Sequence, residues 1–80
     1  MSEGIGVLIT GMCGRMGQET ARAVFEAPDM EIVGGCDISS VGCSISEVVA
    51  GVASEVRITS DLAAAIEASR PDVMVDFTSP

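Results

Sequence analysis

The stretch GMCGRMG, residues 11–17, joins an apolar run to a segment with helical periodicity. A tight turn between a strand and a helix needs glycine where the backbone must approach a phosphate closely. Here Gly11 allows the sharp exit from the strand, Gly14 leaves room for phosphates, and Gly17 lets the helix pack closely. The first N–H groups of the helix and the positive end of its dipole then face the phosphates. The stretch therefore predicts a phosphate-binding turn, although its GxxGxxG spacing differs from the standard GxGxxG.

The segments around this turn alternate between strand and helix patterns. Short apolar runs predict strands over residues 4–10, 30–36, 56–58 and 72–77. Amphipathic periodicity predicts helices over residues 14–27 and 61–69, the second capped by Ser60, and a short helical turn over residues 46–50 capped by Ser46. The residues expected to be buried are Met16, Thr20, Ala23, Val24 and Ala27 in the first helix and Leu62, Ala65 and Ile66 in the second.

This alternation, β-α-β-(α)-β-α-β, predicts an α/β fold of the Rossmann type with a parallel sheet. If the first strand is central, the strand order is 3-2-1-4 and the ligand crevice opens between strands one and four. Thr10 and Gly11 then face Phe77 and Thr78 across the crevice. The sequence ends directly after an apolar strand of the kind usually found inside a larger sheet. We therefore expect a sheet truncated after its fourth strand, residues 1–80 being the N-terminal part of an NAD(P)-binding domain, rather than a stand-alone domain.

An acidic residue after the second strand extends the glycine pattern toward dinucleotide binding. Asp37 stands 20 positions after Gly17, where a carboxylate can accept hydrogen bonds from the ribose hydroxyls of adenosine. The alternative is an ordinary loop aspartate. A P-loop needs a lysine after its last glycine, and the sequence contains no lysine. A short-chain dehydrogenase turn would place a glycine where Arg15 stands.

The composition excludes several classes of partner. The net charge is −8 and the only cations are four arginines, which argues against a nucleic-acid or anionic-membrane surface. No apolar run is long enough to span a membrane and no signal-peptide pattern begins the sequence, so we expect a cytoplasmic protein. The odd set Cys13, Cys36 and Cys43 has no CxxC spacing and no histidine beside it, which predicts free thiols and no metal site.

Two segments together resemble one family, dihydrodipicolinate reductase of bacterial lysine and diaminopimelate synthesis. The first is the core GRMG at residues 14–17, and the second is VDFTSP at residues 75–80, which is similar to the family's Asp-Phe-Thr-x-Pro. The resemblance covers the whole chain in order and spacing. It implies an oxidoreductase that uses NADH or NADPH to reduce a cyclic unsaturated imine dicarboxylate to tetrahydrodipicolinate.

The resemblance also implies a set of cofactor-binding residues. The turn would bind pyrophosphate, Asp37 would bind the adenosine ribose, and Phe77 and Thr78 would lie on the nicotinamide side. The turn residues in this set are Gly11, Met12, Cys13, Gly14, Arg15, Met16 and Gly17. Arg15 could lie along the adenosine phosphates, pair with Glu19 on the helix surface, or do both, and Arg22 has the same spacing to Glu26.

Two departures from the family pattern bear on the cofactor. Family members that use NADPH well often have an arginine directly after the acidic residue, where this sequence has Ile38. Asp37 itself would repel a 2′-phosphate, so NADH is favoured over NADPH. Cys13 stands where the family commonly has glycine, which we expect to tighten the turn without abolishing binding.

The substrate motif of the family, with its histidines and lysine, is absent from this sequence. Proton donation and dicarboxylate binding need such cations, so we expect no catalytic residue in this chain and no substrate domain. We expect the full-length protein to be a homo-oligomer. Its substrate would be a small dicarboxylate. The alternatives are a non-catalytic NAD-sensing regulatory domain and another Rossmann oxidoreductase of amino-acid metabolism, which the paired motifs argue against.

Overall fold

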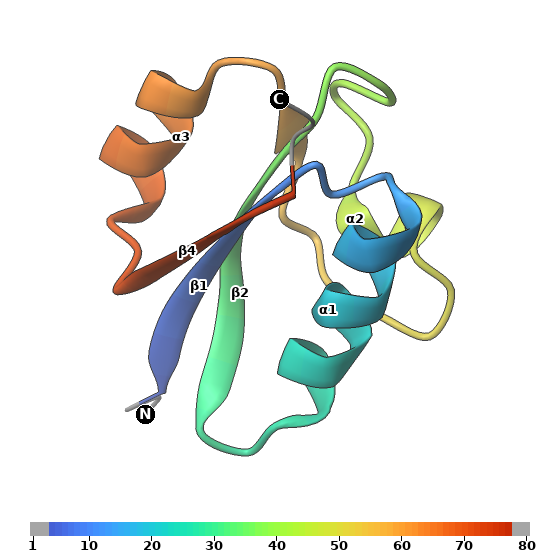
Figure 1. The fold of residues 1–80 in the computed structure, drawn as a ribbon, viewed down its shortest axis with the longest axis vertical. Helices are drawn as coiled ribbons and strands as arrows, with labels where there is room; N and C mark the ends of the chain where they lie inside the picture. The colour runs from blue at the N-terminus through green and yellow to red at the C-terminus, as the bar shows by residue number, and fades with distance from the viewer. Residues whose placement is uncertain (1–3, 78–80) are drawn as a thin grey trace.

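A four-stranded parallel sheet with helices on both faces forms the molecule, as the computed structural model of residues 4–77 shows (Figure 1). The elements follow in the order β1 (Ile5–Thr10), α1 (Arg15–Glu26), β2 (Met30–Cys36), α2 (Ile45–Val48), β3 (Ile58–Thr59), α3 (Leu62–Ser69) and β4 (Val73–Asp76). The sheet order is β3-β2-β1-β4, and each neighbouring pair is parallel. The predicted alternation and the strand order 3-2-1-4 are confirmed.

The central strand β1 is buried on both faces, which explains its unbroken apolar sequence. Val7 and Ile9 belong to the core cluster under α1 and α2, together with Met12, Ala21, Val24, Ile45, Val49, Val52 and Ile58. Leu8 is also fully buried but points to the opposite face, where it contacts Gly34 of β2. In Figure 1, α1 and α2 cover one face of the sheet and α3 covers the other.

The buried face of α1 differs from the predicted one. Its buried residues are Gly17, Ala21 and Val24, whereas Met16 is 56% exposed. Of the five predicted residues only Val24 is fully buried. The helix is turned so that Gly17, and not Met16, faces the preceding turn, and the buried stripe continues from Gly17 at helical spacing.

The predicted N-caps of α2 and α3 are wrong by one or two residues. Ser44 caps α2, where its N–H donates to Glu47 Oε1 at 2.8 Å in a capping box. Asp61 caps α3, because its Oδ1 accepts from the N–H of Ala64 at 3.0 Å. Ser46 and Ser60 therefore do not have the capping roles expected of them.

The side of the sheet formed by α3 and β4 leaves apolar groups exposed. Leu62 and Ile66 of α3 are 38% and 41% exposed, and only Ala65 of the predicted trio is half-buried. Val73 and Met74 of β4 are also exposed, although they project to opposite faces of the strand. Within residues 4–77, β4 pairs only with β1 and lies at an edge of the sheet.

The described helices include none that is long and apolar enough to cross a membrane.

Candidate functional site

An open cleft of about 520 Å³ lies at the carboxyl ends of the strands. This is the edge where ligands bind in open parallel sheets, and the volume is within the range of small-molecule sites. Its lining residues come from the ends of all four strands and the segments that follow them: Thr10, Gly11, Gly14, Cys36, Asp37, Ile38, Ser60, Leu62 and Phe77. The structure thus brings four of the predicted cofactor residues to one cleft, namely Gly11, Gly14, Asp37 and Phe77.

Direct contact between the ends of β1 and β4 forms one wall of this cleft. The N–H of Phe77 donates to the carbonyl of Thr10 at 3.2 Å, and the buried Thr10 hydroxyl donates to Asp76 Oδ1 at 2.6 Å. Gly11 has a φ of +68°, and a Cβ added there would lie 2.9 Å from the Phe77 carbonyl carbon. Any residue other than glycine would therefore be strained at position 11 and would push the two strand ends apart.

The two other glycines of the turn have opposite surroundings. A Cβ at Gly17 would overlap the carbonyl oxygen of Gly11 and lie 2.8 Å from Met12 Cα, so only glycine fits there. A Cβ at Gly14 would meet only the Gly11 carbonyl oxygen, at 3.4 Å, which is an ordinary contact. Gly17 is buried beneath the turn, whereas Gly14 is exposed and lines the cleft. Gly17 therefore serves packing, and Gly14 leaves space open to a ligand.

The N–H groups of the turn divide into two sets. Those of Met12, Cys13 and Gly14 are used within the protein, by the Cys36 carbonyl at 3.1 Å, Asp37 Oδ2 at 2.8 Å and the Gly11 carbonyl at 3.1 Å. The second set belongs to residues 15–17, the first turn of α1, which have no partner within the helix. Gly14, the N-cap of α1, has no side chain to cap them. An anion would therefore be bound by the N–H groups of residues 15–17, and not by those of Met12, Cys13 and Gly14.

Asp37 is anchored at the edge of the cleft. Its Oδ2 accepts from the N–H of Cys13, and its Oδ1 accepts from the N–H of Ser39 at 2.9 Å. Its own N–H donates to the carbonyl of Thr59 at 3.1 Å. Because each carboxylate oxygen can accept a further hydrogen bond, the group can still receive hydroxyl donors from a ligand in the cleft.

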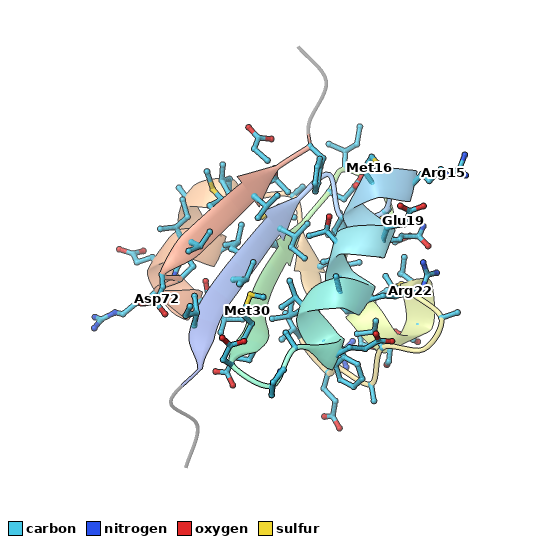
Figure 2. The ribbon with its side chains drawn as sticks, turned by 60° about the horizontal axis from the view of Figure 1, so that its bottom comes forward. Arg15, Met16, Glu19, Arg22, Met30 and Asp72 are labelled. Atoms are coloured by element: carbon cyan, nitrogen blue, oxygen red, sulfur yellow. The ribbon has the colours of Figure 1, made fainter. Side chains whose placement is uncertain are left out.

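None of the four predicted turn residues that have a side chain, Met12, Cys13, Arg15 and Met16, lines the cleft. The side chain of Met12 is fully buried in the core. Figure 2 shows Arg15 and Glu19 on the side of α1 that faces away from the sheet, and Arg15 Nε lies 3.6 Å from Glu19 Oε2. Met16 is exposed next to them. Arg22 Nε donates to the carbonyl of Ala50 at 2.9 Å instead of pairing with Glu26. The predicted Thr78 lies outside the described residues.

All three cysteines are free thiols. Burial raises the pKa of Cys13, and the nearby Asp37 carboxylate raises it further. Burial also raises the pKa of Cys36. Such thiols are protonated and weakly nucleophilic at neutral pH. No cluster of three or more potential metal ligands occurs within residues 4–77.

Several cleft residues were missing from the set expected from the sequence. Ile38, which is 90% exposed, directly follows Asp37, and Ser60 directly follows the end of β3. Leu62 begins α3. The signal that could have found them is their position, because residues just after parallel strands gather at the ligand-binding edge.

The sheet order and the glycine turn at the end of its central strand define a Rossmann-type α/β protein. Residues 5–80 match the family model described as dihydrodipicolinate reductase, N-terminus. The chain therefore belongs to the dihydrodipicolinate reductase family.

Individual relatives agree with this assignment. The chain is 42% identical over 74 residues to 4-hydroxy-tetrahydrodipicolinate reductase of Moorella thermoacetica, covering 92% of this chain and 28% of that protein. It is 38% identical over 84 residues to the protein of the same name from Thermosynechococcus vestitus, covering 100% of this chain and 30% of the relative. A dipicolinate-bound dihydrodipicolinate reductase from Paenisporosarcina sp. TG-14 has the same fold, with a TM-score of 0.74 and 37% identity over 96% of this chain and 29% of that one. The chain thus spans less than a third of the length of these relatives.

Proposed function

We propose that this chain is the cofactor-binding portion of an NAD(P)H-dependent reductase that converts a cyclic dihydrodipicolinate-type imine to tetrahydrodipicolinate in lysine and diaminopimelate synthesis. One observation carries the proposal: Gly14, which is the N-cap of α1, Asp37 and Phe77 all border the same cleft of about 520 Å³. Family membership supports the reaction, because the relatives are named for it.

Each part of the dinucleotide has a chemically suitable partner in this cleft. The N–H groups of residues 15–17 would bind the pyrophosphate, with Gly14 leaving room for it. The carboxylate of Asp37 would accept hydrogen bonds from the adenosine ribose, and Ile38 and Leu62 offer apolar surface to the adenine. Phe77, together with Thr78, would lie on the nicotinamide side. The bound nicotinamide supplies the hydride for the reduction.

NADH is the cofactor that these charges favour. A 2′-phosphate on the ribose would stand next to the Asp37 carboxylate, and the adjacent Ile38 offers it no positive charge. Arg15 is engaged with Glu19 on the outer side of α1. Like charges held close together cost several kcal/mol of binding free energy, so we expect NADH to bind at least tenfold more tightly than NADPH.

The assignment of the pyrophosphate site is tested by Gly14→Val. The Cβ of valine meets nothing closer than 3.4 Å in the protein, so the chain should fold, while the side chain occupies the space meant for the phosphates. We expect no detectable NADH binding by calorimetry and a circular dichroism spectrum like that of the wild type. Unchanged affinity would refute the site.

The cofactor preference is tested by Asp37→Asn, which removes the charge and keeps an oxygen to accept from the Cys13 N–H, while giving up the bond from the Ser39 N–H. The NADH dissociation constant should rise about tenfold, and that of NADPH should change less or fall. Asp29→Asn is the matched control, because Asp29 is exposed in the turn before β2. Equal losses for the two cofactors would contradict the ribose role of Asp37.

The catalytic groups of this reductase belong, in our proposal, to the part of the protein outside this chain. The sequence contains neither histidine nor lysine to donate a proton or bind a dicarboxylate. The chain should therefore bind NADH without oxidising it when the imine substrate is added, which an absorbance assay can follow. We further propose a cytoplasmic location, in keeping with three free thiols, and a homo-oligomeric full-length enzyme.

A further inference from the structure

Gln18, in the second turn of α1, binds two consecutive carbonyl groups of the glycine turn. Its backbone N–H donates to the carbonyl of Gly14 at 2.9 Å, as expected within a helix. Its side-chain Nε2 donates to the carbonyl of Cys13 at 2.8 Å, which lies outside the helix. The side-chain bond is not needed to form α1, so it calls for an explanation of its own.

Cys13 is held from both sides by side chains of different elements. Its carbonyl accepts from Gln18, and its N–H donates to Asp37 at the end of β2. The next N–H, that of Gly14, donates back to the Gly11 carbonyl. The peptide unit between Cys13 and Gly14 is therefore fixed at both its oxygen and its hydrogen.

This fixation matters because the peptide unit precedes a glycine. Gly14 has a φ of −75°, but glycine populates positive φ about as readily, so rotation of the unit has no steric cost at Gly14. Rotation would turn the partial negative charge of the Cys13 oxygen away from Gln18. Gly14 lines the cleft, so an oxygen turned to that side would repel the pyrophosphate of a dinucleotide.

We propose that Gln18 is a positioning residue for the pyrophosphate, because it holds the Cys13 carbonyl away from the site in the orientation that an anion requires. The inference rests on the proposed function, and it assigns a role to a side chain that is not among the residues lining the cleft. Together with Asp37, Gln18 forms a brace around Cys13. The brace joins the second turn of α1 to the end of β2.

The test is Gln18→Met, which keeps the length of the side chain and removes its hydrogen-bond donor. Dissociation constants for NADH, ADP and adenosine would be measured by calorimetry. Loss of one hydrogen bond that orients the site should raise the NADH and ADP values about tenfold and leave the adenosine value unchanged, since adenosine has no pyrophosphate. Arg22→Met is the matched control, because it removes another bond from α1 to a backbone carbonyl, far from the turn. The control should leave all three values within about twofold of the wild type.

Two results would overturn the inference. One is an unchanged affinity of Gln18→Met for ADP, and the other is an equal loss for ADP and adenosine, which would mark Gln18 as merely structural. Amide exchange of Gly14, followed by NMR without ligand, separates this inference from the proposed function. If the wild type bound no dinucleotide, the proposed function would fall. A faster exchange of Gly14 in Gln18→Met would still support the brace, and an unchanged rate would refute it.

Discussion

The N-termini of α1 and α3 both follow a strand of the sheet, but only α3 is capped by a side chain. Each helix begins shortly after a strand of the parallel sheet, and the same cleft is lined by Gly14, the N-cap of α1, and by Leu62, the first residue of α3. At α3 the carboxylate of Asp61 accepts from the N–H of Ala64. At α1 the N-cap is Gly14, and no side chain caps the first turn. The third helix of the described residues, α2, has a capping box formed by Ser44 and Glu47.

This difference is what the proposed anion site at α1 requires, because a capping side chain would compete with the ligand. A capping side chain stabilises a helix by about 1 kcal/mol, and two of these three helices have one. The same carboxylate at α1 would occupy the N–H groups and the positive dipole end that an anion needs. The two helices also differ at their third residue, which is Gly17 in α1 and Ala64 in α3. Close packing against the turn accounts for this second difference.

The largest effect is expected when the first turn of α1 is given the residue found in α3. Gly17→Ala places a Cβ on the Gly11 carbonyl oxygen and against Met12, and the atoms that it meets belong to the backbone and cannot move aside easily. We expect a loss of about 3 kcal/mol of unfolding free energy, a large share of the stability of a typical folded domain. Thermal unfolding followed by circular dichroism measures it. Ala64→Gly is the reciprocal control and should cost only about 1 kcal/mol. A wild-type melting temperature in Gly17→Ala would disprove the packing role.

The next effect is on binding, when α1 receives the cap of α3. Gly14 has φ −75° and ψ 169°, a conformation that an N-cap aspartate adopts readily. Gly14→Asp should therefore raise the melting temperature while weakening NADH about 100-fold, because its carboxylate takes the place of the pyrophosphate. Fluorescence titration of NADH measures the loss. A variant that binds NADH as tightly as the wild type would show that the first turn of α1 is not the anion site.

A smaller effect is expected when the cap of α3 is removed. Asp61→Ala leaves the N–H of Ala64 without its partner and should cost about 1 kcal/mol of stability. The NADH dissociation constant should stay within about twofold, since the pyrophosphate is assigned to α1. Denaturant unfolding and calorimetry give the two numbers. A tenfold loss of NADH affinity would mean that the two helix N-termini do not differ in function as proposed.

The smallest effect concerns α2 and depends on pH. The hydrogen bond from the backbone N–H of Ser44 lowers the pKa of Glu47 below its ordinary value of 4.5. A carboxyl group with a lowered pKa in the folded state adds stability above its unfolded pKa and loses it as the pH falls through the folded value. Glu47→Gln should therefore melt slightly below the wild type at neutral pH, and the gap should close in acid. A gap that stayed constant with pH would rule out this contribution.

Features set by local sequence were predictable, and those set by distant contacts were not. The strands and their order followed from apolar runs and from the glycine turn, because a buried parallel strand leaves a continuous pattern. The caps at Asp61 and Ser44 were placed one or two residues away, since neighbouring Ser and Asp residues have similar capping propensity and the backbone conformation decides between them.

In the candidate site, too, some features follow from local sequence and others from contacts between distant residues. The cleft positions of Gly11, Gly14 and Asp37 follow from strand ends, which sequence reveals. The bond from Cys13 to Asp37 spans 24 positions and appears only when the fold brings the two together. The buried stripe of α1 was misplaced because the contact of Gly17 with the turn, and not helical amphipathicity, fixes the rotation of the helix.

Under the proposed function, an uncapped helix would also tie the lifetime of the fold to the supply of its ligand. A dinucleotide that places its pyrophosphate on the first turn of α1 would act as the missing N-cap. By mass action, a ligand present at 100 times its dissociation constant adds about 2.7 kcal/mol to the free energy of unfolding. This increment lowers the population open to proteases about 100-fold. The abundance of the protein in a cell would then follow the abundance of its cofactor.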